Sequence, residues 1–413
     1  MRSALSTFFL PPGTRPDAAF ILWSRALRAF GDGYMSLLLP FYLTLLGFGA
    51  LEVGVIVTGT LLGSGAMTLA VGFIAHRYRG RSLLRAASLL MAATGVAFVL
   101  VTDFWPLLLV AFMGTLNPSS GDVSVFSPLE HALLSHTVTA RSRTALFARY
   151  SLIGALVGAL GAQAAGLPAV AEQWLAIDLK SALQGMFLLY GALGLMSLAL
   201  YQRLSPRLET QQQSQPTPLG ESRRTVFKLA ALFSLDAFAG GFAVQSLLAL
   251  WLFERFELSV ITAGTVFFWV GIFSALSQLA SARVAARFGL INTMVFTHLP
   301  SSVFLILVPF MPTLPLALVF LFLRSALSQM DVPARTSYVM AVVSAGERPA
   351  AASVTAVPRS LAAAISPAFA GYLLSLTAFG WPLVICGALK IVYDLLLLAM
   401  FRHVTPPEES KSA

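Results

Sequence analysis

The sequence predicts an all-α polytopic membrane protein, with twelve transmembrane helices in two pseudo-symmetric halves of six helices each. Three observations predict this class: the composition, twelve long apolar segments, and a repeat near 209 residues. The 413 residues are 57% hydrophobic and only 11% charged, whereas soluble domains are about 25% charged. Only a lipid-facing surface makes so apolar a chain tolerable. The net charge of +9 is explained by arginines in loops, so no nucleic-acid partner is expected.

A transmembrane helix needs about 20 apolar residues, and twelve segments meet that need. They lie near 18–46, 52–75, 83–102, 106–134, 144–166, 182–201, 226–252, 260–280, 290–310, 315–343, 354–376 and 381–401. The fourth and tenth segments are long enough to extend past the bilayer or to be broken. Helix 5 contains small residues at helical spacing, Gly154, Gly158 and Gly161, which allow close helix packing.

A polar, Gln- and Pro-bearing segment, 202–225, separates the sixth and seventh apolar segments, and its composition is typical of a flexible linker. The predicted organisation is therefore an N-terminal half (1–201), a cytoplasmic linker (202–225), a C-terminal half (226–403) and a cytoplasmic tail (404–413). The halves repeat each other: Gly33-Tyr34 corresponds to Gly241-Phe242, Asp122 to Asp331, and Ser151-Leu152 to Ser360-Leu361. Two six-helix halves in the same orientation are typical of secondary transporters, with the site between them at the midplane.

Charge in the loops predicts the orientation. Arginines gather in alternate loops, including those around 77–85, 203–207, 283–287 and 348, and the opposite loops are poor in them. Because positive charge is retained on the inner side, both termini and the linker are expected in the cytoplasm, in a plasma (bacterial inner) membrane. Residues 1–17 contain no apolar h-region, so no cleavable signal peptide is expected.

One short loop carries a motif. Gly72-Phe-Ile-Ala-His76-Arg77-Tyr-Arg-Gly80-Arg81 joins two apolar segments, and a related stretch with Arg287 recurs downstream. Gly72 and Gly80 are expected to let the chain turn closely.

The loop resembles the motif between helices 2 and 3 of the major facilitator superfamily, Gly-x-x-x-Asp-Arg-x-Gly-Arg-Arg. It departs from that motif in two ways, because His76 replaces the aspartate and one extra residue precedes Gly80. The resemblance covers nearly the whole chain. It implies the twelve-helix fold, alternating access, and a latch on the inner gate at this loop. His76 is either a solvated histidine or a group that serves the latch when protonated.

Charged residues inside the spans are the candidate substrate and proton pathway, because each costs about 2.5–3.5 kcal/mol to insert. Arg28 and Asp32 lie one turn apart, either as a self-neutralising pair or as part of a cavity lining. Asp236 lies 208 residues after Arg28, so a contact between these two is possible. The proton is predicted on Asp32 or Asp122. The full set is Arg25, Arg28, Asp32, Asp122, Asp236, Arg324, Asp331 and Arg335.

Other charges are assigned to the structure. Lys390 and Asp394, one turn apart in the last span, are expected to pair with each other. Glu130 and His131 lie nearer the inner end of helix 4 and receive no role. Pro333 is expected to kink helix 10. The single cysteine, Cys386, excludes a disulfide within the chain and a multi-cysteine metal site.

The function predicted is secondary active transport of a small polar or anionic compound by alternating access, as proton-coupled efflux. The arginines favour an anion because guanidinium matches carboxylates and oxyanions; the alternative is that nearby acids neutralise them pairwise. Two other functions stay open, export of lipophilic drugs and a non-transporting receptor or scaffold with the same fold.

The sequence contains no motif that indicates an enzyme. No phosphate loop, HExxH or Gly-x-Ser-x-Gly motif is present, and the five histidines lack ligand spacing. We therefore expect no enzyme, no cofactor and no metal. The expected partners are the substrate, protons and the lipid bilayer, and the protein is expected to be a monomer.

Overall fold

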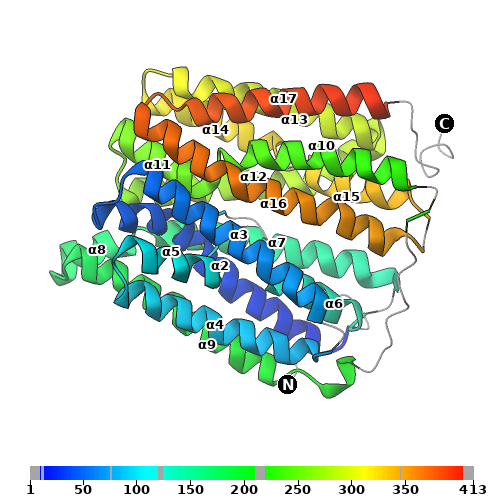
Figure 1. The fold of residues 1–413 in the computed structure, drawn as a ribbon, viewed down its shortest axis with the longest axis horizontal. Helices are drawn as coiled ribbons and strands as arrows, with labels where there is room; N and C mark the ends of the chain where they lie inside the picture. The colour runs from blue at the N-terminus through cyan, green and yellow to red at the C-terminus, as the bar shows by residue number, and fades with distance from the viewer. Residues whose placement is uncertain are drawn as a thin grey trace. The chain divides into compact units, whose positions relative to one another are not determined.

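The computed structural model describes residues 10, 14–74, 77–119, 124–138, 140–209, 219–220, 222–344 and 346–402. Over these residues the regular structure is helical (Figure 1). Nine helices or consecutive helix pairs among them are long and apolar enough to cross a membrane. The helix Asp17–Leu45 is not one of the nine, because its buried charges lower its hydropathy. Each of the twelve predicted spans overlaps one or two of these helices, and the predicted fold class is confirmed.

The chain forms two compact units. Unit 1 comprises Met1–Phe48, Gly59–Gln213 and Ser259–Phe268, and unit 2 comprises Gly49–Thr58, Ser214–Leu258 and Trp269–Ala413. The helices whose greater part lies in unit 1 are α2 (Asp17–Leu45), α3 (Ala50–Ile74), α4 (Gly80–Leu100), α5 (Phe104–Met113), α6 (Phe126–Ser135), α7 (Ala140–Ala164), α8 (Leu167–Leu175), α9 (Leu179–Gln202) and the short η1 (Pro206–Glu209).

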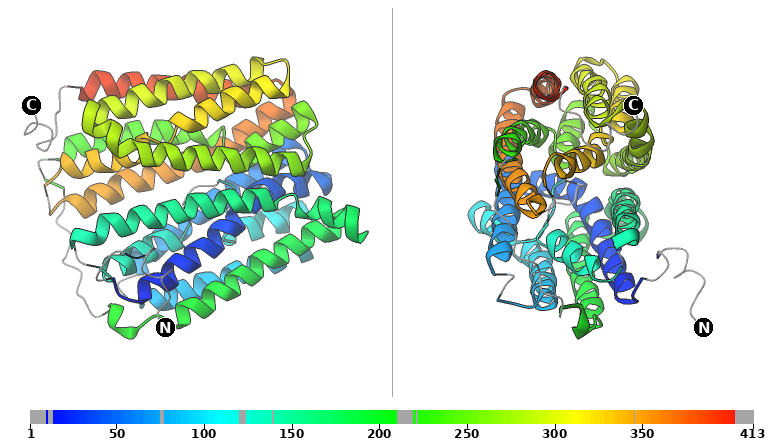
Figure 2. Two further views of the ribbon diagram at one scale, coloured as in Figure 1. Left: turned by 180° about the vertical axis from the view of Figure 1, so that it is seen from behind. Right: turned by 90° about the vertical axis from the view of Figure 1, so that its right-hand side faces the viewer.

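Unit 2 holds the greater part of the remaining helices. They are α10 (Arg223–Gly241), α11 (Gln245–Phe256), α12 (Val260–Phe288), α13 (Leu290–Leu307), η2 (Val308–Phe310), α14 (Leu314–Leu327), α15 (Asp331–Ala341), α16 (Arg348–Leu376) and α17 (Trp381–Phe401). Helix α17 runs beside α13, and α10 runs beside α16 (Figures 1 and 2).

The two units repeat one packing pattern, which gives the sequence repeat a structural basis. In unit 1, α2 packs on α7 and α9, and α4 packs on α9; in unit 2, α10 packs on α16 and α17, and α13 packs on α17. Repeat-related glycines lie at equivalent crossings. A Cβ on Gly33 would come within 2.1 Å of the Gly158 carbonyl on α7, and one on Gly241 within 2.4 Å of the Ala363 carbonyl on α16.

Both long predicted spans are broken. The fourth is divided into α5, which ends at Met113, and α6, which begins at Phe126. The tenth is divided into α14, which ends at Leu327, and α15, which begins at Asp331. The break precedes Pro333, which lies in the first turn of α15, where the absence of its N–H removes no helical bond. The proline therefore follows the break and does not kink a continuous helix.

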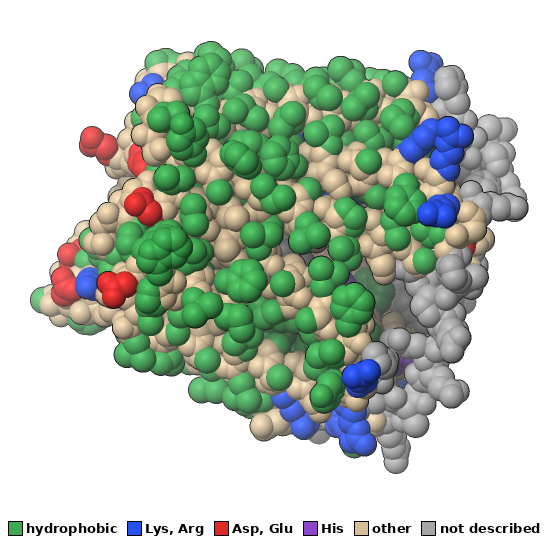
Figure 3. All heavy atoms as spheres, in the orientation of Figure 1, with side chains coloured by type: hydrophobic (Ala, Val, Ile, Leu, Met, Phe, Trp, Pro, Cys, Tyr) green, Lys and Arg blue, Asp and Glu red, His purple; other side chains and the backbone are tan. Residues whose placement is uncertain are grey.

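Within each unit, basic side chains gather at one end of the helices and acidic ones at the other (Figure 3). In unit 2, Arg223 begins α10 and Arg402 follows α17, while Glu254 lies at the opposite end, near the end of α11. The flanks between these ends are covered by hydrophobic side chains (Figure 3), as a lipid-facing surface requires.

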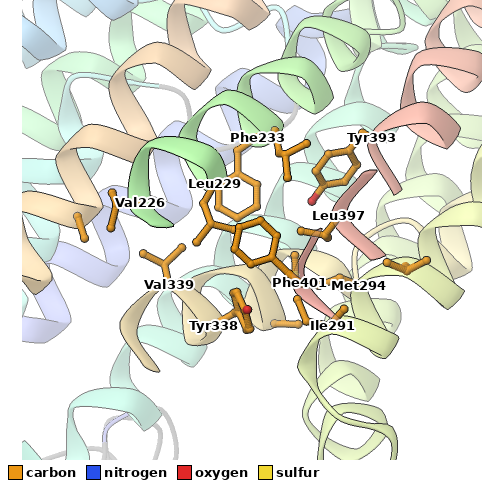
Figure 4. Packing of buried hydrophobic residues seen from close by; sticks show 14 of the residues in the cluster. Val226, Leu229, Phe233, Ile291, Met294, Tyr338, Val339, Tyr393, Leu397 and Phe401 are labelled. Carbon is orange, nitrogen blue, oxygen red and sulfur yellow. The ribbon is translucent and has the colours of Figure 1, made fainter. Parts of the chain in front are cut away.

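A buried apolar cluster lies toward the basic end of unit 2. Side chains from α10, α13, α15 and α17 converge there (Figure 4), among them Phe233, Met294, Tyr338, Leu397 and Phe401. All five are at most 3% exposed.

The close packing of α7 on α2 can be tested by a glycine substitution at their crossing. A Cβ on Gly161 would lie 2.1 Å from the Phe30 carbonyl, and backbone cannot rotate aside. Gly161→Ala is expected to destabilise unit 1 by about 1–3 kcal/mol, because α2 and α7 must separate. The control is Gly185→Ala on α9, where nothing lies within 4 Å and alanine should stabilise the helix by about 0.5–1 kcal/mol. Thermal unfolding in detergent measures both, and equal effects would contradict the packing.

Candidate functional site

Glu130 on α6 is the centre of a polar cluster in unit 1. The carboxylate is fully buried, contacts Nη2 of Arg28 on α2, and accepts hydrogen bonds from Tyr150 Oη at 2.5 Å and Tyr201 Oη at 2.6 Å. The Arg28 guanidinium also lies over the ring of Phe126, 4.2 Å from its centroid. A buried carboxylate with one cation and two hydroxyl donors is well satisfied.

Two other charged residues of α2, Arg25 and Asp32, each lie about one helical turn from Arg28. Arg25 is 5% exposed, lies over Tyr150, and occupies the space beside Gly154, whose absent side chain makes room for the guanidinium. Asp32 is 8% exposed. The face predicted for Arg25, Arg28 and Asp32 is therefore a buried one, and Glu130 is a partner of Arg28 that the sequence did not indicate.

A second, larger cluster occupies unit 2. Asp236 on α10 accepts a hydrogen bond from Lys390 Nζ at 2.6 Å and forms an ion pair with Arg335 Nη2 at 3.0 Å. Arg335 also contacts Asp331, one turn earlier on α15. His298 on α13 lies between Lys390 and Asp394 of α17. Three of the predicted pathway residues, Asp236, Asp331 and Arg335, are thus brought together. We call these six residues the unit 2 charge cluster.

Two arginines of unit 2 keep donors available. Nε and Nη1 of Arg335 have no hydrogen-bond partner among the residues that the structure describes, although the residue is only 7% exposed. Arg324 is half-buried in α14, and its guanidinium forms no hydrogen bond or ion pair with any described residue; its carbonyl accepts from Ser301 Oγ and from the Ser328 N–H. A cation within a span and without a partner is a candidate for a ligand's anion.

Several predicted pairings are wrong or cannot be placed. Lys390 and Asp394 do not pair with each other, because Asp236 and His298 take their places. Asp236 contacts two cations of its own unit, and Arg28 contacts Glu130; the contact between Arg28 and Asp236 stays a prediction. Asp122 and His76 lie outside the described residues.

The predicted gating loop makes its turn differently from the expectation. Gly72 lies inside α3 and Gly80 is the first residue of α4, and neither has a positive φ. In the related downstream stretch, Gly289 does adopt φ +83, directly before α13. The reason is that helix α3 continues past Gly72, and the described turn lies at Arg77 and Tyr78.

The arginines of these loops divide into two kinds. Arg77 and Arg287 are exposed, and Arg287 lies over the ring of Phe288. Arg81 instead donates from Nη1 to the Leu204 carbonyl at 2.8 Å. Arg81 therefore anchors the beginning of the predicted linker, where Asp17 also accepts from the Ser205 N–H at 2.7 Å.

The end of the linker is anchored by Glu347 in unit 2. Its carboxylate accepts from the Gly220 N–H at 2.5 Å, from Ser222 Oγ at 2.9 Å and from Ser344 Oγ at 2.7 Å. These donors lower the pKa of Glu347 from its ordinary 4.5 to about 2, with the Gly220 N–H contributing most.

Because the pKa of Glu347 is lowered, the stability of unit 2 is expected to depend on pH in the acid range. The stabilisation by Glu347 is fully present above pH 4.5 and is lost as the pH falls through the folded pKa of about 2. We expect the unfolding temperature of the wild type to fall more steeply from pH 5 to pH 2 than that of Glu347→Gln. Thermal scans across this range test it, with exposed Glu172→Gln as the control. Parallel curves for the wild type and Glu347→Gln would rule out this contribution.

Sequence reasoning missed the partners that organise both clusters: Glu130, His298 and Lys390. Each is an ionisable residue inside a predicted span, which is by itself a signal of function. The spacing of histidines along the chain tests only for a metal site. It cannot show that His298 has partners on another helix.

Comparison with known proteins agrees with this architecture. The sequence model of the Major Facilitator Superfamily matches residues 229–413. An uncharacterized membrane protein of Saccharomyces cerevisiae is 24% identical over 420 residues, covering 93% of this chain and 94% of that protein.

Solved transporter structures share the fold. A variant of the nucleoside transporter NupG superposes with a TM-score of 0.71 at 15% identity, covering 93% of this chain and all of that one. The human organic anion transporter MFSD10 does so with a TM-score of 0.65 at 17% identity, covering 93% and 100%. A bacterial homolog of the human lysosomal transporter Spinster, inward-facing and occupied, gives 0.69 at 15% identity, covering 92% and 94%.

These findings agree with a polytopic membrane protein that has the fold of solved secondary transporters. The chain has the fold of the major facilitator superfamily and carries that family's sequence pattern over residues 229–413, which confirms the resemblance predicted from its sequence.

Proposed function

We propose that this protein moves a small anion across the membrane by alternating access, coupled to protons. The observation that carries the proposal is the pair of arginines in unit 2 whose donors are open within a span, Arg324 and Arg335. Guanidinium stays charged when desolvated and matches carboxylate and phosphate oxygens.

The two units contribute differently to this proposal. In unit 1 the Arg28 guanidinium is neutralised by Glu130, which is the pairwise alternative considered for the arginines. In unit 2 Arg335 keeps two donors without partners among the described residues, and Arg324 has no acid among them. We therefore assign the anion to unit 2 and a structural role to Arg28.

The test is flux in liposomes, with a panel of small carboxylates, phosphates and sulfonates as candidate substrates. A thermal-shift screen on purified protein selects the ligand, and its accumulation is then measured with and without a pH gradient. Accumulation only with the gradient is the expected result. A cationic or lipophilic ligand would instead favour drug export, and a ligand that binds without flux would favour the receptor alternative.

Efflux, the direction expected from the sequence, has its own test. Exchange of substrate for protons requires that the two occupy the protein alternately, so the substrate should bind more weakly at lower pH. Tighter binding at lower pH would exclude efflux by proton exchange.

We also propose that both termini face the cytoplasm of a bacterial inner membrane, on the charge of the loops. A cysteine at Ser214, outside the described residues, should react with impermeant maleimide only from the cytoplasmic side, in a Cys386→Ala background. One at Thr313, directly before α14, should react only from the exterior. The reverse pattern would invert the orientation.

A further inference from the structure

His298 is the one histidine of the described residues that lies within the unit 2 charge cluster. It is 4% exposed. Its Nδ1 lies 2.9 and 3.0 Å from the two carboxylate oxygens of Asp394, and its Nε2 lies 3.3 Å from Lys390 Nζ. The ring meets Tyr393 edge to face at 6.0 Å. Both ring nitrogens are thus held by charged groups from α17.

These partners assign the tautomer. An ionised carboxylate only accepts, so Nδ1 carries the proton that is donated to Asp394. An ammonium only donates, so Nε2 accepts from Lys390 and is unprotonated. The imidazole is therefore neutral in this arrangement, and Nε2 is the basic position at which a further proton can bind.

The charges in direct contact favour one more proton. Three carboxylates, Asp236, Asp331 and Asp394, are joined to two permanent cations, Arg335 and Lys390. With His298 neutral, these five charged side chains carry a net charge of −1 in a buried environment. A single proton neutralises it.

We propose that the His298–Asp394 dyad is the proton-binding site of this protein, in place of Asp32 or Asp122. The inference rests on the proposed proton coupling and names its residues. We write the site as a dyad because two groups so close titrate together.

Protonation would change the contacts of the cluster. A protonated Nε2 can no longer accept from Lys390, and the two cations repel each other. The nearest acceptor is Asp236 Oδ1, 3.8 Å from Nε2. The imidazolium then competes with Lys390 and Arg335 for that one carboxylate. Proton binding at His298 is thereby linked to Arg335, one of the two arginines assigned to the anion.

The groups around the dyad come from every helix near it. From α13's neighbours they are Asp236 on α10, Arg324 on α14, Asp331 and Arg335 on α15, Arg359 on α16, and Cys386, Lys390 and Tyr393 on α17. Arg359 is exposed and outside the contact set, so its charge is screened more than those of the cluster.

The test is a substrate-free titration of the purified full chain in detergent, with ¹⁵N-labelled histidine followed by NMR. The chain has five histidines, and the loss of one signal in His298→Gln assigns the ring. We expect the Nδ1–H tautomer at high pH and uptake of one proton as the pH is lowered.

Two further variants should move the titration midpoint of His298 in opposite directions. The signal that moves in them also identifies the His298 ring if His298→Gln fails to fold. Asp394→Asn removes the negative partner and should lower the midpoint by about one pH unit or more, and Lys390→Gln removes the ammonium and should raise it similarly. The control is His131→Gln in unit 1, which should leave the midpoint unchanged. A His298 signal that stays constant as the pH is lowered, or midpoints that move in the same direction in both variants, would overturn the proposal.

This readout separates the dyad from the transport proposal. If the wild-type protein titrates as expected but shows no pH-driven flux, the proton site stands and the proton coupling is rejected. Flux driven by pH in a protein whose His298 does not titrate would reject the dyad and return the proton to Asp32 or Asp122.

Discussion

Arg324→Gln is expected to weaken binding of a small organic anion about a hundredfold, or about 2.7 kcal/mol. The guanidinium lies half-buried in α14 without a side-chain partner among the described residues. An anion bound there loses one of its countercharges when the guanidinium is removed, and this loss in a desolvated site is a few kcal/mol.

The ligand for this measurement is the carboxylate, phosphate or sulfonate selected by thermal shift, and binding is measured by calorimetry. Arg324→Lys should recover only part of the affinity, because an ammonium lacks the two-pronged geometry. Arg335→Gln should show a loss of similar size. Exposed Arg255→Gln at the end of α11 is the matched control and should bind as the wild type does. Unchanged affinity in both Arg324→Gln and Arg335→Gln would make these arginines structural.

Glu130→Gln is expected to destabilise the protein by about 3–5 kcal/mol, because it removes the carboxylate that Arg28 contacts in a buried site. Both partners are at most 2% exposed, so water cannot replace the lost charge. The hydroxyls of Tyr150 and Tyr201 lose their charged acceptor as well.

A double-mutant cycle separates the ion pair from the packing around it. Arg28→Met with Glu130→Leu should recover most of the stability that either single change removes, because an apolar pair replaces two charges. Tyr201→Phe is the milder control, with an expected loss of about 1.5–3 kcal/mol for one hydrogen bond to a charged group. A Glu130→Gln protein that unfolds at the wild-type temperature would show that the pair contributes nothing.

The two clusters place opposite charges at repeat-related positions. Arg28 on α2 corresponds to Asp236 on α10 in the repeat, and both side chains are buried. In unit 1 Arg28 contacts Glu130, and in unit 2 Asp236 contacts both Lys390 and Arg335. This difference explains why the same fold supports a structural pair in unit 1 and, in our proposal, a titrating cluster in unit 2.

The sequence by itself determined the class, the spans and the repeat. These depend on local quantities: about 20 apolar residues for each span, loop composition, and a constant offset between the halves. Helix breaks could be anticipated in the same way, because the fourth and tenth segments were too long for one span. The resemblance in the loop around Arg77 and Arg81 was enough to indicate the superfamily.

Only the tertiary structure decided which charges are partners. Arg28 and Asp32 share a helical face, and so do Lys390 and Asp394, so spacing along one helix favoured pairs within that helix. The partners found come from other helices: Glu130 is 102 residues from Arg28, and Asp236 is 154 residues from Lys390. A buried charge is stabilised by whichever opposite charge the packing brings within contact, and that choice depends on how helices cross, which no local pattern records.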